Sequence, residues 1–278
     1  NSSVRGLSRR QAAGFTYYLF FFKCLISSSY MCGILLLSRL ECGIMKLSMI
    51  QNLAIWGDSL LKGIIFDEKT SRYKPLKTCS VNLFSKAFPF TVKNNSRFGC
   101  TAPKALENLQ ASLNNGLQAE VALLEFGGND CDYNWSEISR NPEAHHEPHT
   151  PFQTFCSTME KMADLLLSHS IKPVFMNLPP IDGERYYRWI SSLKDTDPKA
   201  ILKWLGGQTD TIYRQQERYS RAMERVAYQK NLPLIDVRDE FLAIHNYRDY
   251  LCLDGIHLNE QGQKVMADIF QSYAMNYA

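Results

Sequence analysis

Residues 53–60 read Leu-Ala-Ile-Trp-Gly-Asp-Ser-Leu, an apolar run that breaks without transition into a polar corner. An apolar run that stops at a Gly-Asp-Ser corner is typical of a buried parallel strand that ends in a tight turn. The turn would hold the hydroxyl of Ser59 at the carboxyl end of the strand, where open α/β sheets bind their ligands. The corner alone also fits a simpler role, because Asp58 and Ser59 belong to the residue types that cap helices and form turns.

Three later segments carry polar groups that can act together with a serine. In residues 97–102, Gly99 precedes a helical stretch and can point its backbone N–H at a ligand. Residues 121–130 read as a second buried strand that ends in two glycines and Asn129, whose side-chain amide can donate. In residues 254–259, an aspartate and a histidine stand three positions apart, just before the C-terminal helix. Serine, a glycine amide, an asparagine amide, aspartate and histidine are the groups that acyl transfer uses.

These four segments, in this order, resemble the SGNH hydrolases, also called the GDSL lipase and esterase family, over residues 51 to 270. The resemblance implies that Ser59 is the nucleophile and that Asp254 and His257 complete a catalytic triad. The implied activity is the hydrolysis of carboxylic esters by a serine esterase that needs no cofactor. The resemblance assigns the oxyanion hole to the backbone N–H groups of Ser59 and Gly99 and to the side chain of Asn129.

The residues support the same chemistry on their own. A serine hydroxyl is a poor nucleophile at neutral pH and needs a general base within hydrogen-bonding reach, usually a histidine. His257 is the best-placed histidine, because Asp254 lies three residues before it and a short loop can aim both side chains the same way. The alternative role for Asp254 is to cap the helix that begins near Asn259, although Asn259 could provide that cap itself. Four other histidines are predicted to lie at the surface, namely His145, His146, His149 and His169.

Strand-like and helix-like segments alternate along the rest of the chain. This alternation predicts a three-layer α/β/α fold with a doubly wound parallel sheet of about five strands, the flavodoxin-like arrangement that the SGNH resemblance also implies. A helix is expected near residues 60–65, followed by a lysine-rich segment at 69–75. The remaining strands are predicted at 90–93, 121–126, 173–178 and 232–237, and the remaining helices at 103–113, 152–169, 211–230 and 261–273.

Two insertions are expected to cross the carboxyl edge of the sheet and to shape the substrate pocket. One follows Asn129 and contains Tyr133 and Trp135, and the other follows a Pro-Pro pair and contains Trp189. Aromatic and arginine side chains there would suit a polar ester, such as an acetylated sugar or a lysophospholipid head group, although each ring could instead belong to an ordinary core. The predicted pocket residues are Asp58, Asp130, Tyr133, Trp135, Trp189 and Ile256.

The preferred interpretation is a serine esterase that acts on a small-molecule ester with an acetyl or other short acyl group. No long uninterrupted apolar segment is available to line a lipid tunnel, which favours short acyl chains. The competing enzyme is a lysophospholipase or lipase at a membrane interface, which requires a real N-terminal anchor. The competitor from another class is a non-catalytic binding module on the same fold, which the presence of all the candidate groups disfavours. The oligomeric state stays open.

The composition fits one enzyme domain. With 45% hydrophobic and 12% aromatic residues, the chain can bury a large core and is neither disordered nor fibrous. Its 31 basic and 28 acidic residues leave a net charge of +3 without a long basic run, so nucleic acid is not an expected partner. The 8 cysteines show no CxxC pair and no metal-ligand spacing, which argues against a zinc site and for reduced thiols in a cytoplasmic protein.

The N-terminal extension, residues 1–44, differs from the predicted hydrolase domain at 45–278. A pair of arginines precedes interrupted apolar runs within residues 15–37, which is a weak match to a signal or a membrane anchor. Three interpretations stay open for the extension: non-native or upstream-translated sequence, a poor signal or anchor, and a docking helix. A cytoplasmic enzyme of this class could begin at Met45, whereas membrane contact or export requires residues 15–37 to be a real anchor or signal.

Overall fold

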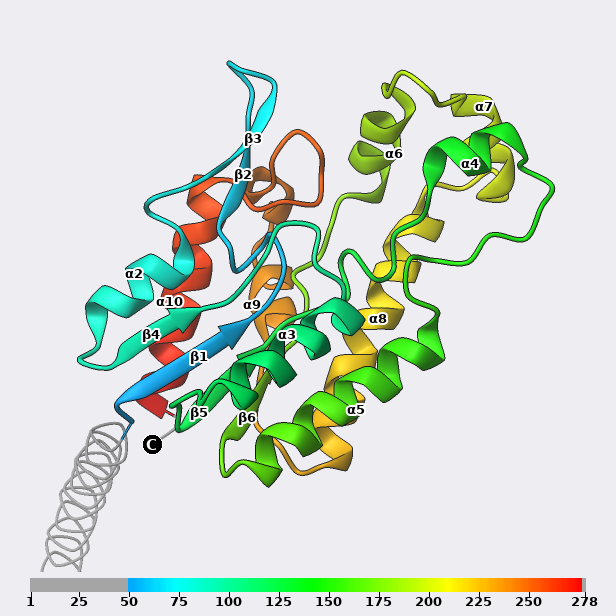
Figure 1. Cartoon of the computed structure of the whole chain (residues 1–278). Coiled ribbons are helices and arrows are strands. Elements are labelled where there is room, and N and C mark those ends of the chain that lie inside the picture. The colour runs from blue at the N-terminus through cyan, green and yellow to red at the C-terminus, as the bar shows by residue number, and fades with distance from the viewer. Residues whose placement is uncertain (1–49, 277–278) are drawn as a thin grey trace, which may run out of the picture. The chain divides into compact units, whose positions relative to one another are not determined.

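The computed structural model describes residues 50–276 of the chain (Figure 1). Within it, Ile50–Tyr273 form one compact unit. The predictions for residues 1–44, including an anchor at 15–37 and a start at Met45, lie outside the described residues. In the part that is described, no helix combines the length and the apolar character that a membrane span requires.

The central sheet confirms the predicted parallel arrangement. Its strands are hydrogen-bonded in the order β4-β1-β5-β6-β7, and all four neighbouring pairs are parallel. Leu53 of β1 pairs with Val92 on one side and with Val121 on the other. With the first strand flanked by the second and the third along the chain, this is the flavodoxin-like doubly wound order. The strands are β1 (Asn52–Trp56), β4 (Thr91–Asn94), β5 (Val121–Leu124), β6 (Lys172–Met176) and β7 (Leu234–Ile235).

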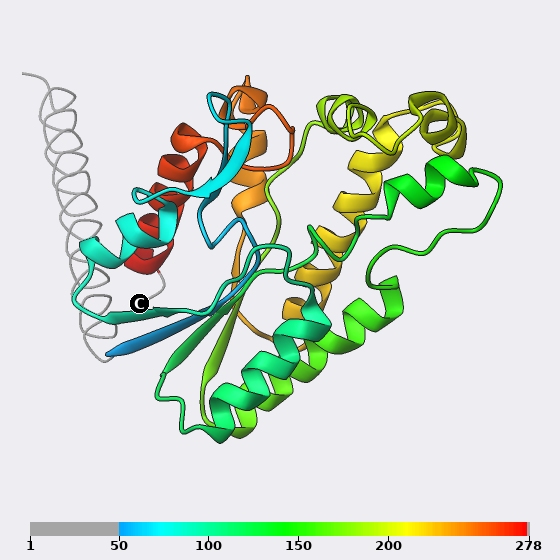
Figure 2. The same cartoon turned by 45° about the horizontal axis from the view of Figure 1, so that its top comes forward.

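Helices cover both faces of this sheet (Figure 2). The helices α3 (Ala102–Asn114), α5 (Phe152–Ser168) and α8 (Asp210–Gln229) pack on one face, and α2 (Ser80–Ala87), α9 (Val237–Leu242) and α10 (Glu260–Asn276) lie on the other. The predicted helices at 103–113, 152–169, 211–230 and 261–273 are therefore confirmed. The main core joins strand residues such as Trp56 and Phe175 to helix residues such as Leu109, Phe155 and Met223, all with almost no exposed surface.

The helix expected at residues 60–65 does not form. Residues after Ser59 make a single turn, in which the Lys62 N–H donates to the Asp58 carbonyl at 3.0 Å. Gly63 then adopts a φ of +70°, a left-handed conformation that ends the turn, and a Cβ atom there would lie 2.2 Å from the Cβ atom of Cys79. The chain continues instead into an antiparallel ribbon of β2 (Ile64–Asp67) and β3 (Arg72–Pro75), which contains the lysine-rich segment.

The two predicted insertions form a group of three short helices that we call the cap. It consists of α4 (Trp135–Arg140), α6 (Gly183–Ser191) and α7 (Pro198–Trp204), which lie together above one end of α8 (Figure 1). The cap has a core of its own, formed by Trp135, Ile138, Tyr186, Ile190, Ile201 and Ile212 with other apolar side chains. A short 3-10 helix, η1 (Tyr247–Tyr250), precedes the loop that contains Asp254 and His257. None of these short helices was predicted, because each is too short to show a clear helical period.

Candidate active site

The turn after β1 holds Ser59 at the carboxyl edge of the sheet. The Oδ1 atom of Asp58 accepts the N–H of Leu60 at 2.8 Å, which closes a short local turn around the serine. The carbonyl of Ser59 accepts the N–H of Ile64 at 2.9 Å. Both Asp58 and Ser59 are buried, with exposed fractions of 4% and 7%. The Gly-Asp-Ser turn therefore holds Ser59 in a buried position that backbone hydrogen bonds fix.

Ser59, His257 and Asp254 form a continuous chain of hydrogen bonds. The Oγ atom of Ser59 lies 2.8 Å from Nε2 of His257, and Nδ1 of His257 lies 2.6 Å from Oδ2 of Asp254. The other carboxylate oxygen of Asp254 accepts the backbone N–H groups of Ile256 and His257. Burial raises the pKa of the Asp254 carboxyl, but the hydrogen bonds and the charge of His257 outweigh it and hold that pKa below its usual range.

The alternative capping role for Asp254 is not needed. The Oδ1 atom of Asn259 accepts the N–H groups of Gln261 and Gly262 at 3.0 Å each, so Asn259 caps the start of α10. Asp254 is fully buried. Its two oxygens accept hydrogen bonds from its own loop, from His257 and from one further donor, a tyrosine. The geometry of Asp254 is thus that of a residue that orients a histidine.

That further donor is Tyr73, which sequence reasoning missed. Its hydroxyl donates to Oδ2 of Asp254 at 2.9 Å, and its ring centroid lies 5.0 Å from that of His257. Burial and the negative charge of Asp254 raise the pKa of the Tyr73 phenol, so it remains a donor. Tyr73 stands on β3 of the ribbon, in a polar stretch where no local pattern distinguishes it from a surface tyrosine.

Three groups at the sheet edge can bind an oxyanion. The side chain of Asn129 is oriented by one of its Nδ2 hydrogens, which it donates to Oδ2 of Asp58 at 2.9 Å, and its second hydrogen remains available. Gly99 has a φ of +67° and lies in an exposed turn. No described residue accepts a hydrogen bond from the backbone N–H of Ser59 or of Gly99. These donors are the ones that the sequence predicted for an oxyanion hole.

Two buried carboxyl groups lie at the turn that holds Ser59, one from Asp58 in the turn and one from Glu125 packed against it. Glu125, the residue after β5, has no exposed surface, and its Oε2 atom accepts the N–H of Asp58 at 3.2 Å. Burial raises the pKa of Asp58 and raises that of Glu125 well above its usual range. Sequence reasoning missed Glu125, although an acidic residue inside an apolar run such as Val-Ala-Leu-Leu-Glu-Phe is itself a signal of a functional or paired carboxyl.

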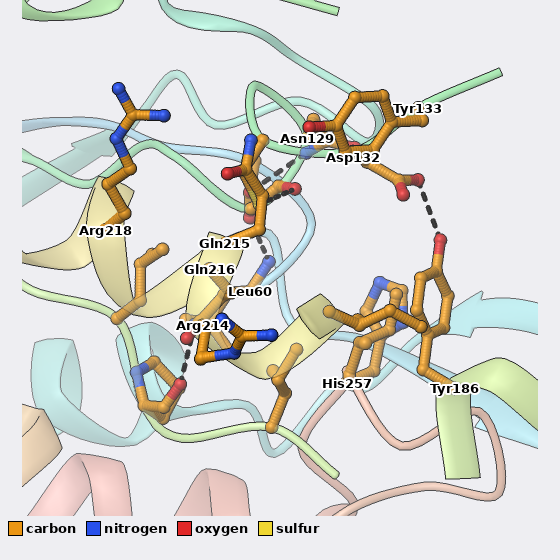
Figure 3. Close-up of a pocket in the computed structure, with 18 of the residues that line it drawn as sticks. Leu60, Asn129, Asp132, Tyr133, Tyr186, Arg214, Gln215, Gln216, Arg218 and His257 are labelled. Carbon is orange, nitrogen blue, oxygen red and sulfur yellow. Dashed lines mark hydrogen bonds between the residues drawn. The ribbon is translucent and has the colours of Figure 1, made fainter. Parts of the chain in front are cut away.

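A cavity of about 310 Å³ opens beside Ser59, between the sheet edge, α8 and the cap (Figure 3). Its volume falls within the range of small-molecule sites. Figure 3 shows side chains of α8, of the loop after Asn129 and of α6 facing one another across it. Of the predicted pocket residues, Asp58, Tyr133, Trp135 and Ile256 line the cavity.

Two predicted pocket residues do not line this cavity. Asp130 is fully buried, and its Oδ1 atom accepts the N–H of Ala102 in the first turn of α3 at 2.9 Å. Burial raises the pKa of Asp130 to about 6. Trp189 packs instead against the ribbon, with ring centroids 4.6 Å from Phe66 and 6.3 Å from Tyr73. Trp189 follows Tyr186 by one turn of α6 and also packs against the cap core, so its ring fills the space between that core and the ribbon and does not reach the cavity.

The far end of the cavity is aromatic and polar. The hydroxyl of Tyr186 and the indole N–H of Trp135 donate to the two oxygens of Asp132, at 2.7 and 2.8 Å. The ring of Trp204 lies 4.8 Å from that of Tyr133. Residues from the first turns of α8 complete the wall, and sequence reasoning missed them because they lie far along the chain from the motifs: Thr211, Ile212, Arg214, Gln215, Gln216 and Arg218.

The other candidate ligands do not gather into a second site within residues 50–276. His145 and His149 are exposed, His146 is half-buried, and His169 stands at the C-terminal end of α5, as expected. In this described part, no group of three His, Cys, Asp or Glu side chains could hold a metal ion. Its cysteines are free thiols, and four of these are buried, namely Cys79, Cys100, Cys131 and Cys252, whereas Cys156 is half-buried.

The sequence of this chain matches a known protein family. The model of the GDSL-like Lipase/Acylhydrolase family matches residues 55–265, which contain the turn of Ser59 and the loop of His257. A GDSL esterase/lipase from Oryza sativa subsp. japonica, WDL1, is 24% identical over 157 residues. The match covers 55% of this chain and 52% of the rice protein, so the matched part spans about half the length of that relative.

Solved structures share the fold. The lipase/acylhydrolase from Enterococcus faecalis aligns with a TM-score of 0.57 at 16% identity, over 81% of this chain and 95% of that one. Axe2, an acetylxylan esterase from Geobacillus stearothermophilus, aligns with a TM-score of 0.52 at 17% identity, over 81% of this chain and 94% of that one. At these identities the likeness establishes the three-layer α/β/α fold and nothing finer.

Proposed function

Because the chain belongs to the GDSL-like lipase/acylhydrolase family, we propose that it hydrolyses ester bonds and that Ser59, His257 and Asp254 carry the reaction. The observation that supports the proposal most directly is the hydrogen-bonded chain from Oγ of Ser59 to the carboxylate of Asp254. In this arrangement His257 can take the serine proton on Nε2, while Asp254 fixes the tautomer by accepting the proton on Nδ1.

The acylation step follows from these positions. Oγ of Ser59 attacks the ester carbonyl as its proton passes to Nε2 of His257, and the carbonyl oxygen becomes an oxyanion. The N–H groups of Ser59 and Gly99 and the free amide hydrogen of Asn129 are available to bind that oxyanion. When the tetrahedral intermediate collapses, the C–O bond to the leaving group breaks and Nε2 gives the proton to the departing oxygen.

Deacylation repeats the same steps with water. The oxygen of a water molecule attacks the acyl carbon while His257 takes a proton from that water. The tetrahedral intermediate then expels Oγ of Ser59, which recovers the proton from His257. The products are a carboxylic acid and an alcohol, and the site returns to its starting state. Every proton transfer in this cycle uses one nitrogen, so it requires no metal or cofactor.

For the substrate, we propose a polar ester with a short acyl group, such as an acetylated sugar. The far end of the cavity supports this, because Tyr133 and Trp204 offer ring faces while Gln215 and Arg218 offer hydrogen-bond donors. The fold relative from Geobacillus stearothermophilus is named as an acetylxylan esterase, which agrees with that class. A lysophospholipase would need a continuous apolar groove for a long chain, whereas charged side chains, Asp132 and Arg218 among them, interrupt the apolar lining of this cavity.

The first experiment compares wild type with Ser59→Ala on p-nitrophenyl acetate. We expect the variant to lose about 10⁶-fold in kcat, because the nucleophile is gone. Ser80→Ala is the matched control: Ser80 is a buried serine on α2 whose hydroxyl has no hydrogen-bond partner among the described residues, and its removal should leave kcat unchanged. Equal rates for wild type and Ser59→Ala would rule out the serine mechanism and would favour the non-catalytic binding module.

A further inference from the structure

Glu125 is a buried acid that the reaction cycle does not use. Its Oε2 atom accepts the N–H of Asp58, and its Oε1 atom has no hydrogen-bond partner among the described residues. A Cβ atom on Gly57 would lie 2.8 Å from Oε2, so the nucleophile turn packs directly against this carboxyl group. An ionised carboxylate without a partner for one oxygen would be costly here, whereas a neutral carboxylic acid would be far less so.

Asp58, by contrast, is arranged as a carboxylate. Its Oδ1 atom accepts the Leu60 N–H at 2.8 Å and its Oδ2 atom accepts a hydrogen of the Asn129 amide at 2.9 Å. Both donors favour the ionised form of an acid. Of the two neighbouring carboxyl groups, Asp58 is therefore the one that keeps its charge, and Glu125 is the one that keeps a proton.

Arg214 and Arg218 line the same cavity, but no described cation forms an ion pair with Asp58 or Glu125. The groups that face the pair are Asp130, which is another buried acid, and His257, whose side chain is committed to Asp254 and Ser59. The buried guanidinium of Arg238 is engaged by Glu217, Gln216 and the Leu178 carbonyl. Burial raises the pKa of Glu125 strongly, and the charge of Asp58 raises it further.

We propose that Glu125 is a positioning residue that works as a neutral carboxylic acid. Its Oε2 atom accepts the Asp58 N–H, and the Asp58 carboxylate in turn orients Asn129. The pair carries one proton and one negative charge. This arrangement supports the nucleophile turn and one oxyanion donor from below without placing two negative charges beneath the developing oxyanion.

The kinetic consequence appears on the alkaline side of the pH profile. When Glu125 loses its proton, a second buried charge opposes the oxyanion, so kcat should fall while KM changes little. Glu125→Gln preserves a carbonyl acceptor and a donor but cannot ionise, so it is the conservative variant. Glu125→Ala removes the carboxyl group and leaves the Asp58 N–H without an acceptor.

The kinetic test rests on the proposed function and measures kcat and KM for p-nitrophenyl acetate between about pH 6 and 10, with spontaneous hydrolysis subtracted. Near neutral pH, Glu125→Ala should lower kcat about 10-fold or more at nearly constant KM, and Glu125→Gln should restore it to within about 3-fold of wild type. Wild type should lose activity at alkaline pH, and Glu125→Gln should not. Identical alkaline declines in both proteins, or a glutamine variant as slow as the alanine variant, would overturn the proposal.

A second test does not depend on ester hydrolysis. Infrared spectra at about pH 8 should show the C=O band of a protonated carboxyl group in wild type and not in Glu125→Gln, because an ordinary glutamate is ionised at that pH. Asp130→Asn serves as the control and should keep the band, since the pKa of Asp130 is about 6 and it is mostly ionised there. A spectrum of wild type without the band would disprove a neutral Glu125, even if Ser59 proved catalytic. The band together with an inactive enzyme would contradict the proposed function instead.

Discussion

The sheet edge and the cap are built in different ways. At the sheet edge, Ser59 and Asn129 lie in the turns that follow the adjacent strands β1 and β5, and their side chains are held by hydrogen bonds of 2.8 to 2.9 Å to His257 and Asp58. The cap comes from two insertions that are far apart in the chain and joins them through a separate apolar core. The difference teaches that backbone turns position the proposed reacting groups, whereas helix packing determines the shape of the cavity.

The two regions should therefore respond differently to substitution. A change at the sheet edge alters a tightly packed place, because a Cβ atom on Gly128 would lie only 3.1 Å from Oδ2 of Asp58. A change in the cap alters the volume and polarity of a cavity whose walls are side chains. We expect kcat to respond at the edge and substrate preference to respond in the cap.

The largest expected effect is that of His257→Ala. It should lower kcat about 10⁶-fold, as fully as Ser59→Ala does, because the serine and its base act as one unit. The double variant should be no slower than either single variant, within error. Rates are compared on p-nitrophenyl acetate, and circular dichroism verifies folding. A double variant that is slower by a further large factor would show that the two residues do not share a step.

A smaller effect is expected for Asn129→Ala. Loss of one oxyanion donor should reduce kcat about 10²–10³-fold and leave KM nearly unchanged, because the donor binds charge that develops only in the transition state. Asn108→Ala is the matched control: the side chain of Asn108 bonds only the Lys104 carbonyl within α3, far along the chain from the site. An Asn129 variant whose KM rises while kcat is kept would indicate that this amide binds the ground state instead.

The smallest effect is expected in the cap, from Trp204→Ala. Wild type should act best on acetyl to butyryl esters and less well on longer ones, because charged side chains such as Asp132 and Arg218 interrupt the lining of the cavity. Removing the indole should raise kcat/KM for hexanoyl relative to acetyl esters about 3–10-fold, since each buried methylene adds up to ~0.8 kcal/mol. Trp189→Ala, a tryptophan that faces the ribbon, should not alter this ratio. A wild-type kcat/KM that keeps rising to eight carbons would contradict the short-acyl proposal and favour a lysophospholipase.

The local sequence pattern was enough to predict the structure wherever a single segment forms a whole strand, turn or helix. The apolar run that ends at Gly57 predicted β1 and the turn of Ser59, and the alternation of strands and long helices predicted the sheet and its covering layers. Asp254 and His257 could be paired because three residues separate them and one loop aims both. In each case the backbone within a few residues determines where the side chain points.

Only the tertiary structure decided what depends on contacts between distant segments. Tyr73 reaches Asp254 across 181 positions, because the ribbon folds over the triad instead of continuing as a helix after Ser59. Asp130 and Trp189 were predicted to line the pocket, but Asp130 contacts the first turn of α3 and Trp189 contacts the ribbon. The physical reason is that strand ends and tight turns are determined by local backbone geometry, whereas the partner of an individual side chain depends on which elements pack beside it.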